Sequence, residues 1–163
     1  MESDDVALLY AWENDTQLWP VSNAQTPFNH FTLETFVNAS HQDIYTNKQL
    51  RLMICKRNDN QTIGVVDLYE FDPQHARAGI GIYLHENFRG NGYAAEAVKK
   101  MVEYAFTILH LKQVYTHINT DNLASLALFE SCGFEKSGLK KYWHKTGLNT
   151  YTDVWFLQCY NAS

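Results

Sequence analysis

Apolar residues recur every three or four positions in four stretches of the chain, and this spacing predicts amphipathic helices. The most regular stripe runs from Ala94 to Leu109 and has a period close to that of an α-helix. The four predicted helices cover residues 3–14, 32–45, 94–109 and 121–133.

Short polar residues mark the expected ends of these helices. Ser3 and Thr32 are predicted to cap the first two, because a hydroxyl in that position accepts a hydrogen bond from a free amide of the first turn. Asp121 or Asn122 takes this place in the last helix, and Gly133 is predicted to end it.

Six further apolar stretches are rich in β-branched and aromatic residues, and turn sequences such as DPQH and KTGLN separate them. These stretches predict strands over residues 49–57, 62–72, 75–85, 112–119, 134–144 and 150–160. Their order along the chain combines hairpins with one β-α-β crossover, so we expect a mixed sheet.

Length and composition favour one globular domain over residues 1–163. The sequence is 45% hydrophobic and 14% aromatic, which is enough to build a packed core. No repeat, linker or low-complexity tract interrupts it. A disordered chain is therefore not expected.

Charge and cysteine usage narrow the choice of compartment and partners. The net charge of −5 argues against nucleic acid as the main partner and is compatible with a cationic substrate. Cys55, Cys132 and Cys159 are odd in number and widely spaced, which is typical neither of a disulfide framework nor of a metal site. No apolar run is long enough to span a membrane, and the acidic start lacks the basic region of a signal peptide. We expect a cytoplasmic protein without metal or membrane partners.

The stretch ENFRGNGYAAEAV places Arg89, Gly90 and Gly92 where a helix must begin. Glycines leave room for a ligand to approach the backbone, and the first amides of a helix have no partner within it. Together with an arginine they form a pyrophosphate site. A tight turn with a surface arginine is the alternative, because the full dinucleotide pattern G-x-G-x-x-G is absent.

The chain resembles the GNAT superfamily of acyl-CoA-dependent N-acetyltransferases over roughly residues 3–158. The run from Arg89 to Ala94 fits the cofactor loop R/Q-x-x-G-x-G/A. The family's later N-x-x-S/A-x-x-L-Y/F-x-x-x-G-F segment is met by Asn122, Ser125, Leu128, Phe129, Gly133 and Phe134. YAWEND and GVVDLYEFDPQHARAGIGIYL bring it closest to the branch of spermidine acetyltransferases and ribosomal-protein N-terminal acetylases.

This resemblance implies a fold of the α/β (α+β) class. A GNAT-like, mixed, mostly antiparallel twisted sheet of about six to seven strands would be flanked by about four helices. Relatives usually begin with a strand before the first helix, and no such strand is predicted here, which leaves the edge of the sheet open.

The resemblance also implies acetyl-CoA as the co-substrate. Backbone groups of Ile82, Tyr83 and Leu84 would contact the pantetheine arm, and residues 89–95 would hold the pyrophosphate. The implied cofactor-binding residues are Ile82, Tyr83, Leu84, Arg89, Gly90, Asn91, Gly92, Tyr93, Ala94, Ala95, Asn122, Ser125 and Phe129. For Asn122, a plain helix cap is an equal alternative.

The implied reaction is attack of a neutral amine on a thioester. A primary ammonium has a pKa near 10.4, so at neutral pH only about 10⁻³ to 10⁻⁴ of it is free base, and a base helps. Glu70 is the candidate base, because relatives carry an acidic residue there. Asp67 should face the other way on a regular strand, and His75 lies in a predicted turn. Glu70 as an ordinary strand-edge charge is the alternative.

The expected general acid is missing. The family often has a tyrosine where this chain has Phe129. The thiolate could leave without an acid, Ser131 or Cys132 could supply the proton, or the protein could bind acyl-CoA without turnover. The function implied is transfer of an acetyl group to a primary amine, of a polyamine such as spermidine or of a protein or peptide.

Two other functions stay open. One is a non-catalytic acyl-CoA-binding or sensing module, and the other is a binder of ATP or NAD with the same glycine loop. A small antibiotic amine as acceptor and a homo-oligomeric state are also left open. An aromatic set near the first helices could line an acceptor groove or form the core, and its members are Tyr10, Trp12, Trp19, Phe28 and Phe31.

Overall fold

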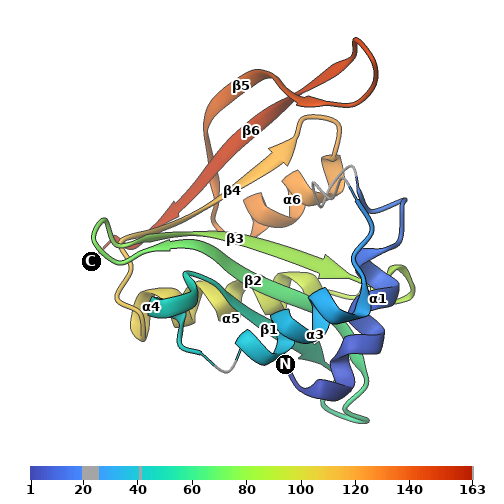
Figure 1. Cartoon of the computed structure of the whole chain (residues 1–163). Coiled ribbons are helices and arrows are strands. Elements are labelled where there is room, and N and C mark those ends of the chain that lie inside the picture. Colours follow the sequence, from blue (N-terminus) through green and yellow to red (C-terminus); the bar gives the residue numbers. More distant parts are fainter. Residues whose placement is uncertain (20–25, 41, 163) are drawn as a thin grey trace. The chain divides into compact units, whose positions relative to one another are not determined.

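The computed structural model describes residues 1–19, 26–40 and 42–162. It divides the chain into two compact units, Met1–Asn47 and Lys48–Ser163, which we describe separately (Figure 1). The interpretation of residues 1–163 as a single domain stays a prediction.

The first unit is helical. It contains η1 (Ser3–Asp5), α1 (Val6–Glu13), α3 (His30–Ala39) and α4 (Ile44–Asn47). Helices α1 and α3 pack together. Sequence periodicity predicted one helix over residues 32–45, which is wrong, because α3 ends at Ala39. The Ser40 hydroxyl donates to the Val37 carbonyl at 2.6 Å, and the Asn47 side chain donates to the Ala39 carbonyl at 2.6 Å. These side chains satisfy the carbonyls that a longer helix would have used.

Two of the predicted caps differ in the structure. Asn29, not Thr32, caps α3, since its side-chain oxygen accepts from the Thr32 amide at 2.8 Å. At the start of the chain a capping box joins Glu2 and Asp5, so Ser3 is not the cap. Of the two predicted candidates, Asp121 and Asn122, it is Asn122 that caps its helix.

The second unit is built on a six-stranded sheet with the order β1-β2-β3-β4-β6-β5. The strands are β1 (Leu50–Cys55), β2 (Thr62–Asp72), β3 (Arg77–Leu84), β4 (Gln113–Asn119), β5 (Glu135–Lys145) and β6 (Tyr151–Tyr160). Only the β3–β4 pair is parallel. This confirms the predicted mixed, mostly antiparallel sheet, and the described residues contain five α-helices instead of about four.

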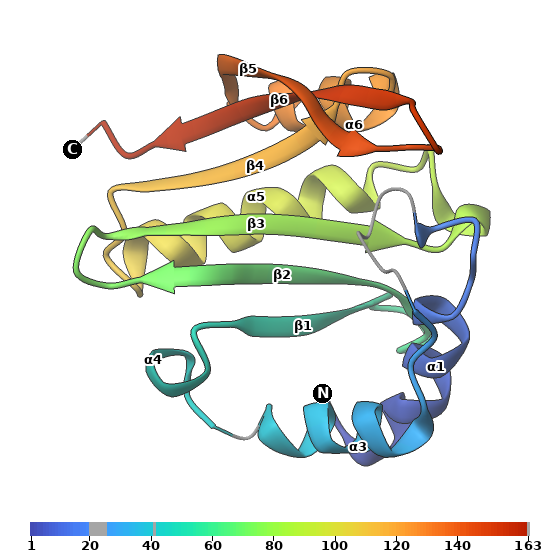
Figure 2. The same cartoon turned by 45° about the horizontal axis from the view of Figure 1, so that its top comes forward.

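One face of the sheet is covered by helix α5 (Tyr93–Thr107), which contacts β2, β3 and β4 (Figure 2). Leu68 and Ile80, which pair in the strand register, and Val114, which pairs with Ala78, are fully buried on this face. Helix α6 (Leu123–Ser131) packs against α5, and Gly133 just beyond it has a φ of +91°. In the part of the chain that the structure describes, no helix is both long and apolar enough to cross a membrane.

The opposite face of the sheet carries the intervening residues of the same strands, and several of these are polar. We call it the polar face and define it by Asp67, Tyr69, Tyr115 and His117. Register pairs Asp67 with Gly81, Tyr69 with Gly79, and Gly79 with Tyr115, so these positions share one side. The Tyr69 ring lies directly over β3, because a Cβ added to Gly79 would come within 2.2 Å of it.

Gly79→Ala is expected to lower the free energy of unfolding by about 1–3 kcal/mol, because the added methyl overlaps the Tyr69 ring and forces it to move. Urea denaturation measures this. Gly138→Ala in β5 is the matched control, since a Cβ there meets no atom within 4 Å. Equal losses in the two variants would contradict the close contact between Gly79 and Tyr69.

Candidate active site

Strands β3 and β4 are paired at one end only and diverge along the rest of their length. Their pairing joins Arg77–Gly79 to Gln113–Tyr115 and goes no further, although both strands continue. Figure 1 shows β4 running away from β3 toward its carboxyl end, and Figure 2 shows the same divergence. The two strands thus leave a gap that opens toward residues 84 and 119.

The gap exposes one backbone edge of β3. The His85 amide donates to the Ile63 carbonyl at 2.9 Å, which fixes the residues that bond to β2. Because bonding direction alternates along a strand, the amides and carbonyls of Ile82 and Leu84 point toward the gap. By the same alternation the amide of Tyr83 is directed to β2. A ligand with amide groups could therefore pair with β3 like an added strand.

At the open end of the gap, the glycine loop leads into α5. Gly90 and Gly92 have φ of +77° and +82°, a left-handed conformation that glycine adopts without strain. Gly92 is the N-terminal cap of α5, and a Cβ built on either glycine would meet no atom within 4 Å. Amides of the first turn and the positive end of the helix dipole thus adjoin free space, as an anion site requires.

Arg89 and Asn91 hold the loop in this shape. The Nε of Arg89 donates to the Leu84 carbonyl at 2.9 Å, which ties the loop back to the end of β3. The Asn91 side chain donates to the carbonyl of Arg89 at 3.1 Å. Both side chains are exposed, so the remaining guanidinium donors can turn to a ligand.

At the closed end of the gap, Glu70 sits in a β-bulge. The register of β2 against β3 slips between Tyr69 and Asp72, and Glu70 has a φ of +49°. Its carboxylate accepts a hydrogen bond from the Tyr115 hydroxyl at 2.7 Å, which brings it to the polar face. The prediction that Glu70 and Asp67 face opposite ways is therefore wrong. It assumed a regular strand, and the bulge restores both residues to one side.

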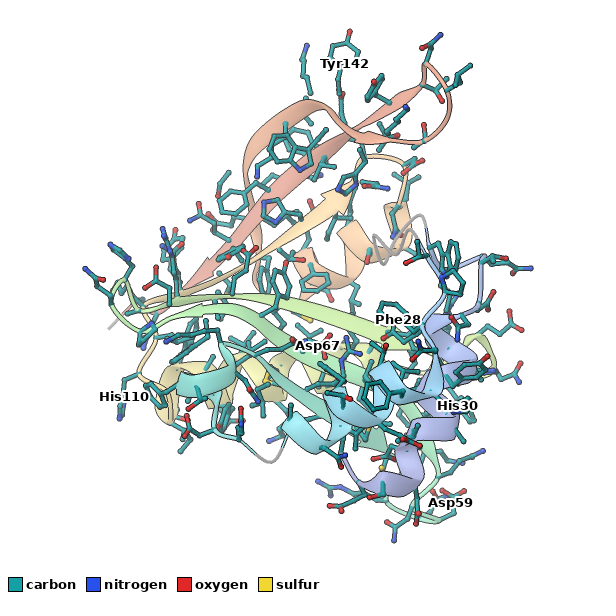
Figure 3. All side chains as sticks on the ribbon, in the orientation of Figure 1. Phe28, His30, Asp59, Asp67, His110 and Tyr142 are labelled. Carbon is teal, nitrogen blue, oxygen red and sulfur yellow. The ribbon has the colours of Figure 1, made fainter. Side chains whose placement is uncertain are left out.

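The other candidates for the base, Asp67 and His75, each have a charged partner. Asp67 is held by Arg51 at 2.7 Å, and Figure 3 shows it on the sheet. His75 lies in the turn after β2, as predicted, where its ring is 2.8 Å from Asp72. Its backbone amide and ring together lower the pKa of Asp72.

Two tyrosines border the same end of the gap. Burial, the hydrogen bond to Glu70 and the charge of Glu70 raise the pKa of Tyr115, so its hydroxyl stays protonated and donates. Burial first, and then the Glu70 charge, raise the pKa of Tyr69 to about 12. The Tyr69 hydroxyl also bonds to the side chain of Thr116 in β4, next to the point where the strands separate.

Sequence reasoning missed His117 and Lys140. His117 lies on β4 two residues beyond Tyr115, and its Nε2 is 2.8 Å from the Nζ of Lys140 on β5. Nearby, His144 Nδ1 and Asn119 Oδ1 are 2.5 Å apart. The alternation of Tyr115, His117 and Asn119 along β4 was a usable signal, since it places all three on one face.

Burial first, and then the Lys140 charge, lower the pKa of His117, so the neutral imidazole accepts from the lysine ammonium. Lys140→Met should raise the pKa of His117, because both the repelling cation and the donor to the neutral ring are lost. Titration of the His117 ring by NMR measures this, with the exposed neighbour Lys141→Met as the control. An unchanged pKa in Lys140→Met would mean that burial alone sets it.

The residues predicted to contact the cofactor from α6 have structural roles in part. The Asn122 side chain caps α6 by accepting from the Ser125 amide at 3.2 Å, which is the plain structural role. Phe129 is buried and packs edge-on against Phe134. Its assignment as a cofactor contact stays a prediction, as does that of Ser125.

The two candidate acids lie at the end of α6. The Ser131 hydroxyl donates to the Leu128 carbonyl at 2.6 Å within its own helix. The Cys132 sulfur lies 3.8 Å from the carbonyl of Ala95, in the first turn of α5. Cys132 therefore adjoins the glycine loop, and neither residue has an established role as an acid.

The aromatic residues of the first unit differ in burial and packing. Trp12 is buried, Tyr10 stacks on His30 at 4.0 Å, and Phe31 is exposed. A hollow in this unit is lined instead by Ser3, Val6, Glu34, Val37 and Asn38. Figure 3 labels Phe28, whose backbone amide and carbonyl both bond to the side chain of Asn14.

Among the residues that the structure describes, no group of three or more metal-ligating side chains is gathered.

Comparison with known proteins gives one consistent family. A model described as the acetyltransferase (GNAT) domain matches residues 1–135. The uncharacterized N-acetyltransferase p20 of Bacillus licheniformis is 30% identical over 146 residues, covering 89% of this chain and 82% of that protein. Spermidine N(1)-acetyltransferase of Vibrio cholerae is 30% identical over 115 residues, covering 70% of this chain and 64% of that protein.

A solved structure agrees in fold. The crystal structure of spermidine N-acetyltransferase from Vibrio cholerae in complex with CoA and spermine aligns with a TM-score of 0.88 at 24% identity. The alignment covers 98% of this chain and 92% of that chain. The protein therefore belongs to the GNAT acetyltransferase family.

Proposed function

We propose that the protein transfers an acetyl group from acetyl-CoA to a primary amine of a small polyamine such as spermidine. The observation that carries this proposal is the gap between β3 and β4. A free backbone edge runs along it, a helix N-terminus with two glycines adjoins its open end, and Glu70 lies at its closed end.

The fit to acetyl-CoA follows from the chemistry of these groups. The pantetheine arm contains two amides, which suit the amide and carbonyl of Ile82 and the amide of Leu84. The amides of the first turn of α5 suit a pyrophosphate, with Arg89 adding positive charge. When bound in this way, the acetyl-CoA would present a thioester carbonyl at the closed end of the gap.

Glu70 is the proposed base. It would hold the acceptor ammonium by charge and take its proton, directly or through a water, while the Tyr115 hydroxyl orients the carboxylate. An amide of the β3 edge would donate to the developing oxyanion. A thiolate leaves readily compared with an alkoxide, so the phenylalanine at position 129 does not prevent turnover.

The choice of a polyamine rests on charge and on the comparisons. The chain has a net charge of −5, and the relative and the solved structure named above act on or bind spermidine and spermine. A protein α-amine and an antibiotic amine are the other acceptors. Competition settles the choice: with spermidine, an N-terminal peptide and an aminoglycoside present together, acetylspermidine should form first. Preferential acetylation of the peptide would overturn the polyamine assignment.

The second candidate is a non-catalytic acyl-CoA-binding or sensing module. The buried Phe129 favours it, because it puts no hydroxyl where the family often has one. Such a module would bind acetyl-CoA without releasing thiol in the presence of any amine. The proposal also includes a cytoplasmic location, which rests on the cysteine pattern of the sequence, and leaves assembly into a homo-oligomer to a sedimentation measurement.

A further inference from the structure

Lys140 meets an unusual set of partners. Its Nζ is 2.8 Å from the imidazole of His117, 4.4 Å from the centre of the Trp143 ring and 5.7 Å from that of Phe156. By contrast, the amines of Lys56, Lys100 and Lys136 pair with carboxylates, as salt bridges usually do. Lys140 is thus held by a base and two aromatic rings.

Lys140 itself is in regular register, since it pairs with Val154, which pairs with Asn119 of β4, and an irregularity follows it in β5. The register against β6 slips between Lys140 and His144, and Tyr142 in between has a φ of +53°. The Tyr142 amide donates to Asp153 at 2.7 Å, which fixes the bulge, and Figure 3 shows Tyr142 in the β5 region away from β4. The register thus places Lys140 on the face of His117, and the bulge after it brings Trp143, three residues further on, to the same amine.

The amine lies near the proposed reaction centre. His117 follows Tyr115, the last residue of β4 that pairs with β3, by about 7 Å along the strand. It shares the polar face with Tyr115, whose hydroxyl binds Glu70. The rings of His117 and Tyr115 lie 5.7 Å apart, so the Lys140 amine lies one ring beyond the tyrosine that binds Glu70.

We propose that Lys140 is acetylated by the protein's own active site. This inference rests on the proposed use of acetyl-CoA. The neutral imidazole of His117 takes a proton from the Lys140 ammonium, and the freed amine attacks the thioester carbonyl. A carbon–nitrogen bond forms, the carbon–sulfur bond breaks, and the second amine proton passes to the departing thiolate, so that CoA thiol and acetyl-lysine result.

The lowered pKa of His117 supports this step, because an imidazole that is neutral at pH 7 can accept the proton. Acetylation removes the cation beside His117. The acetylated protein should therefore show a raised pKa for His117, in the same direction as Lys140→Met.

The experiment incubates the purified protein with acetyl-CoA and no added amine, and follows its intact mass and the modified peptide. We expect one acetyl group at Lys140, and a rate that is independent of protein concentration, as an intramolecular step requires. Lys140→Arg should lose this acetyl group, whereas Lys141→Arg should keep it. His117→Gln should slow it at least tenfold.

Three results would overturn the inference. If Lys140 stays unmodified while the same sample acetylates spermidine, self-acetylation is wrong and the proposed function stands. If Lys140 is acetylated equally fast in Gly92→Val, which should bind acetyl-CoA far more weakly, the modification is ordinary chemical acetylation. If neither spermidine nor Lys140 is acetylated, the proposed function fails and this inference fails with it.

Discussion

Glu70→Gln is expected to lower kcat for polyamine acetylation by about 10²- to 10⁴-fold, with little change in acetyl-CoA affinity. General base catalysis typically contributes a factor of this size, and an amide cannot accept the proton of an ammonium. The substitution keeps the shape of the side chain in the β-bulge, so the backbone at φ +49° is not disturbed. Steady-state thiol release at saturating acetyl-CoA measures the effect.

Two companion variants separate the base from a structural role. Tyr115→Phe removes the hydrogen bond to Glu70 but leaves the carboxylate, so it should lose much less activity. Glu103→Gln removes an exposed carboxylate that pairs with Lys100 on α5 and should behave as wild type. If Tyr115→Phe is as inactive as Glu70→Gln, the pair acts by holding the sheet together, and Glu70 is not the base.

Gly92→Val is expected to weaken acetyl-CoA binding by about 100-fold or more. Hydrogen bonds to a charged group are worth about 1.5–3 kcal/mol each, and a branched side chain at the cap of α5 would keep a pyrophosphate from the amides of the first turn. Isothermal titration calorimetry with CoA measures the affinity. A loss of this size amounts to about 2.7 kcal/mol of binding free energy.

The left-handed backbone requires a matched control. Valine at φ +82° is strained by itself, at roughly 1–2 kcal/mol or more. Gly133→Val creates the same strain, since Gly133 has a φ of +91° and equally open surroundings, but it lies after α6 and not in the glycine loop. Both variants should lose stability, and Gly92→Val alone should lose CoA. Equal affinities in the two variants would argue against a phosphate site at the loop.

The sequence predicted those features that depend on local patterns. The strands were correctly assigned because their apolar runs were bounded by turns, and α5 because its stripe was long and regular. The glycine loop was recognisable because Gly90 and Gly92 stand between a predicted strand and a predicted helix, and both have a positive φ in the structure. Gly133 was correctly placed after α6, and Asn122 was one of two candidates for its cap, because caps depend on neighbouring residues.

The features that were missed depend on contacts between distant residues. Strand periodicity could not show that Glu70 adopts a left-handed conformation, which reverses the side of the sheet that its carboxylate reaches. The end of α3 at Ala39 depends on the side chain of Asn47, which takes up its carbonyl. His117 and Lys140 meet across β6, so their contact depends on the strand order and register, which the sequence did not show.

The most direct test of the account is to count two products of one reaction. The wild-type protein is given saturating acetyl-CoA and spermidine, and CoA thiol and acetylspermidine are measured together over time. After allowance for one equivalent bound to the protein, one thiol should appear for every acetylated amine, and both should cease when the amine is left out. Tight binding of acetyl-CoA with no thiol release in the presence of any amine would contradict the account and identify a binding module.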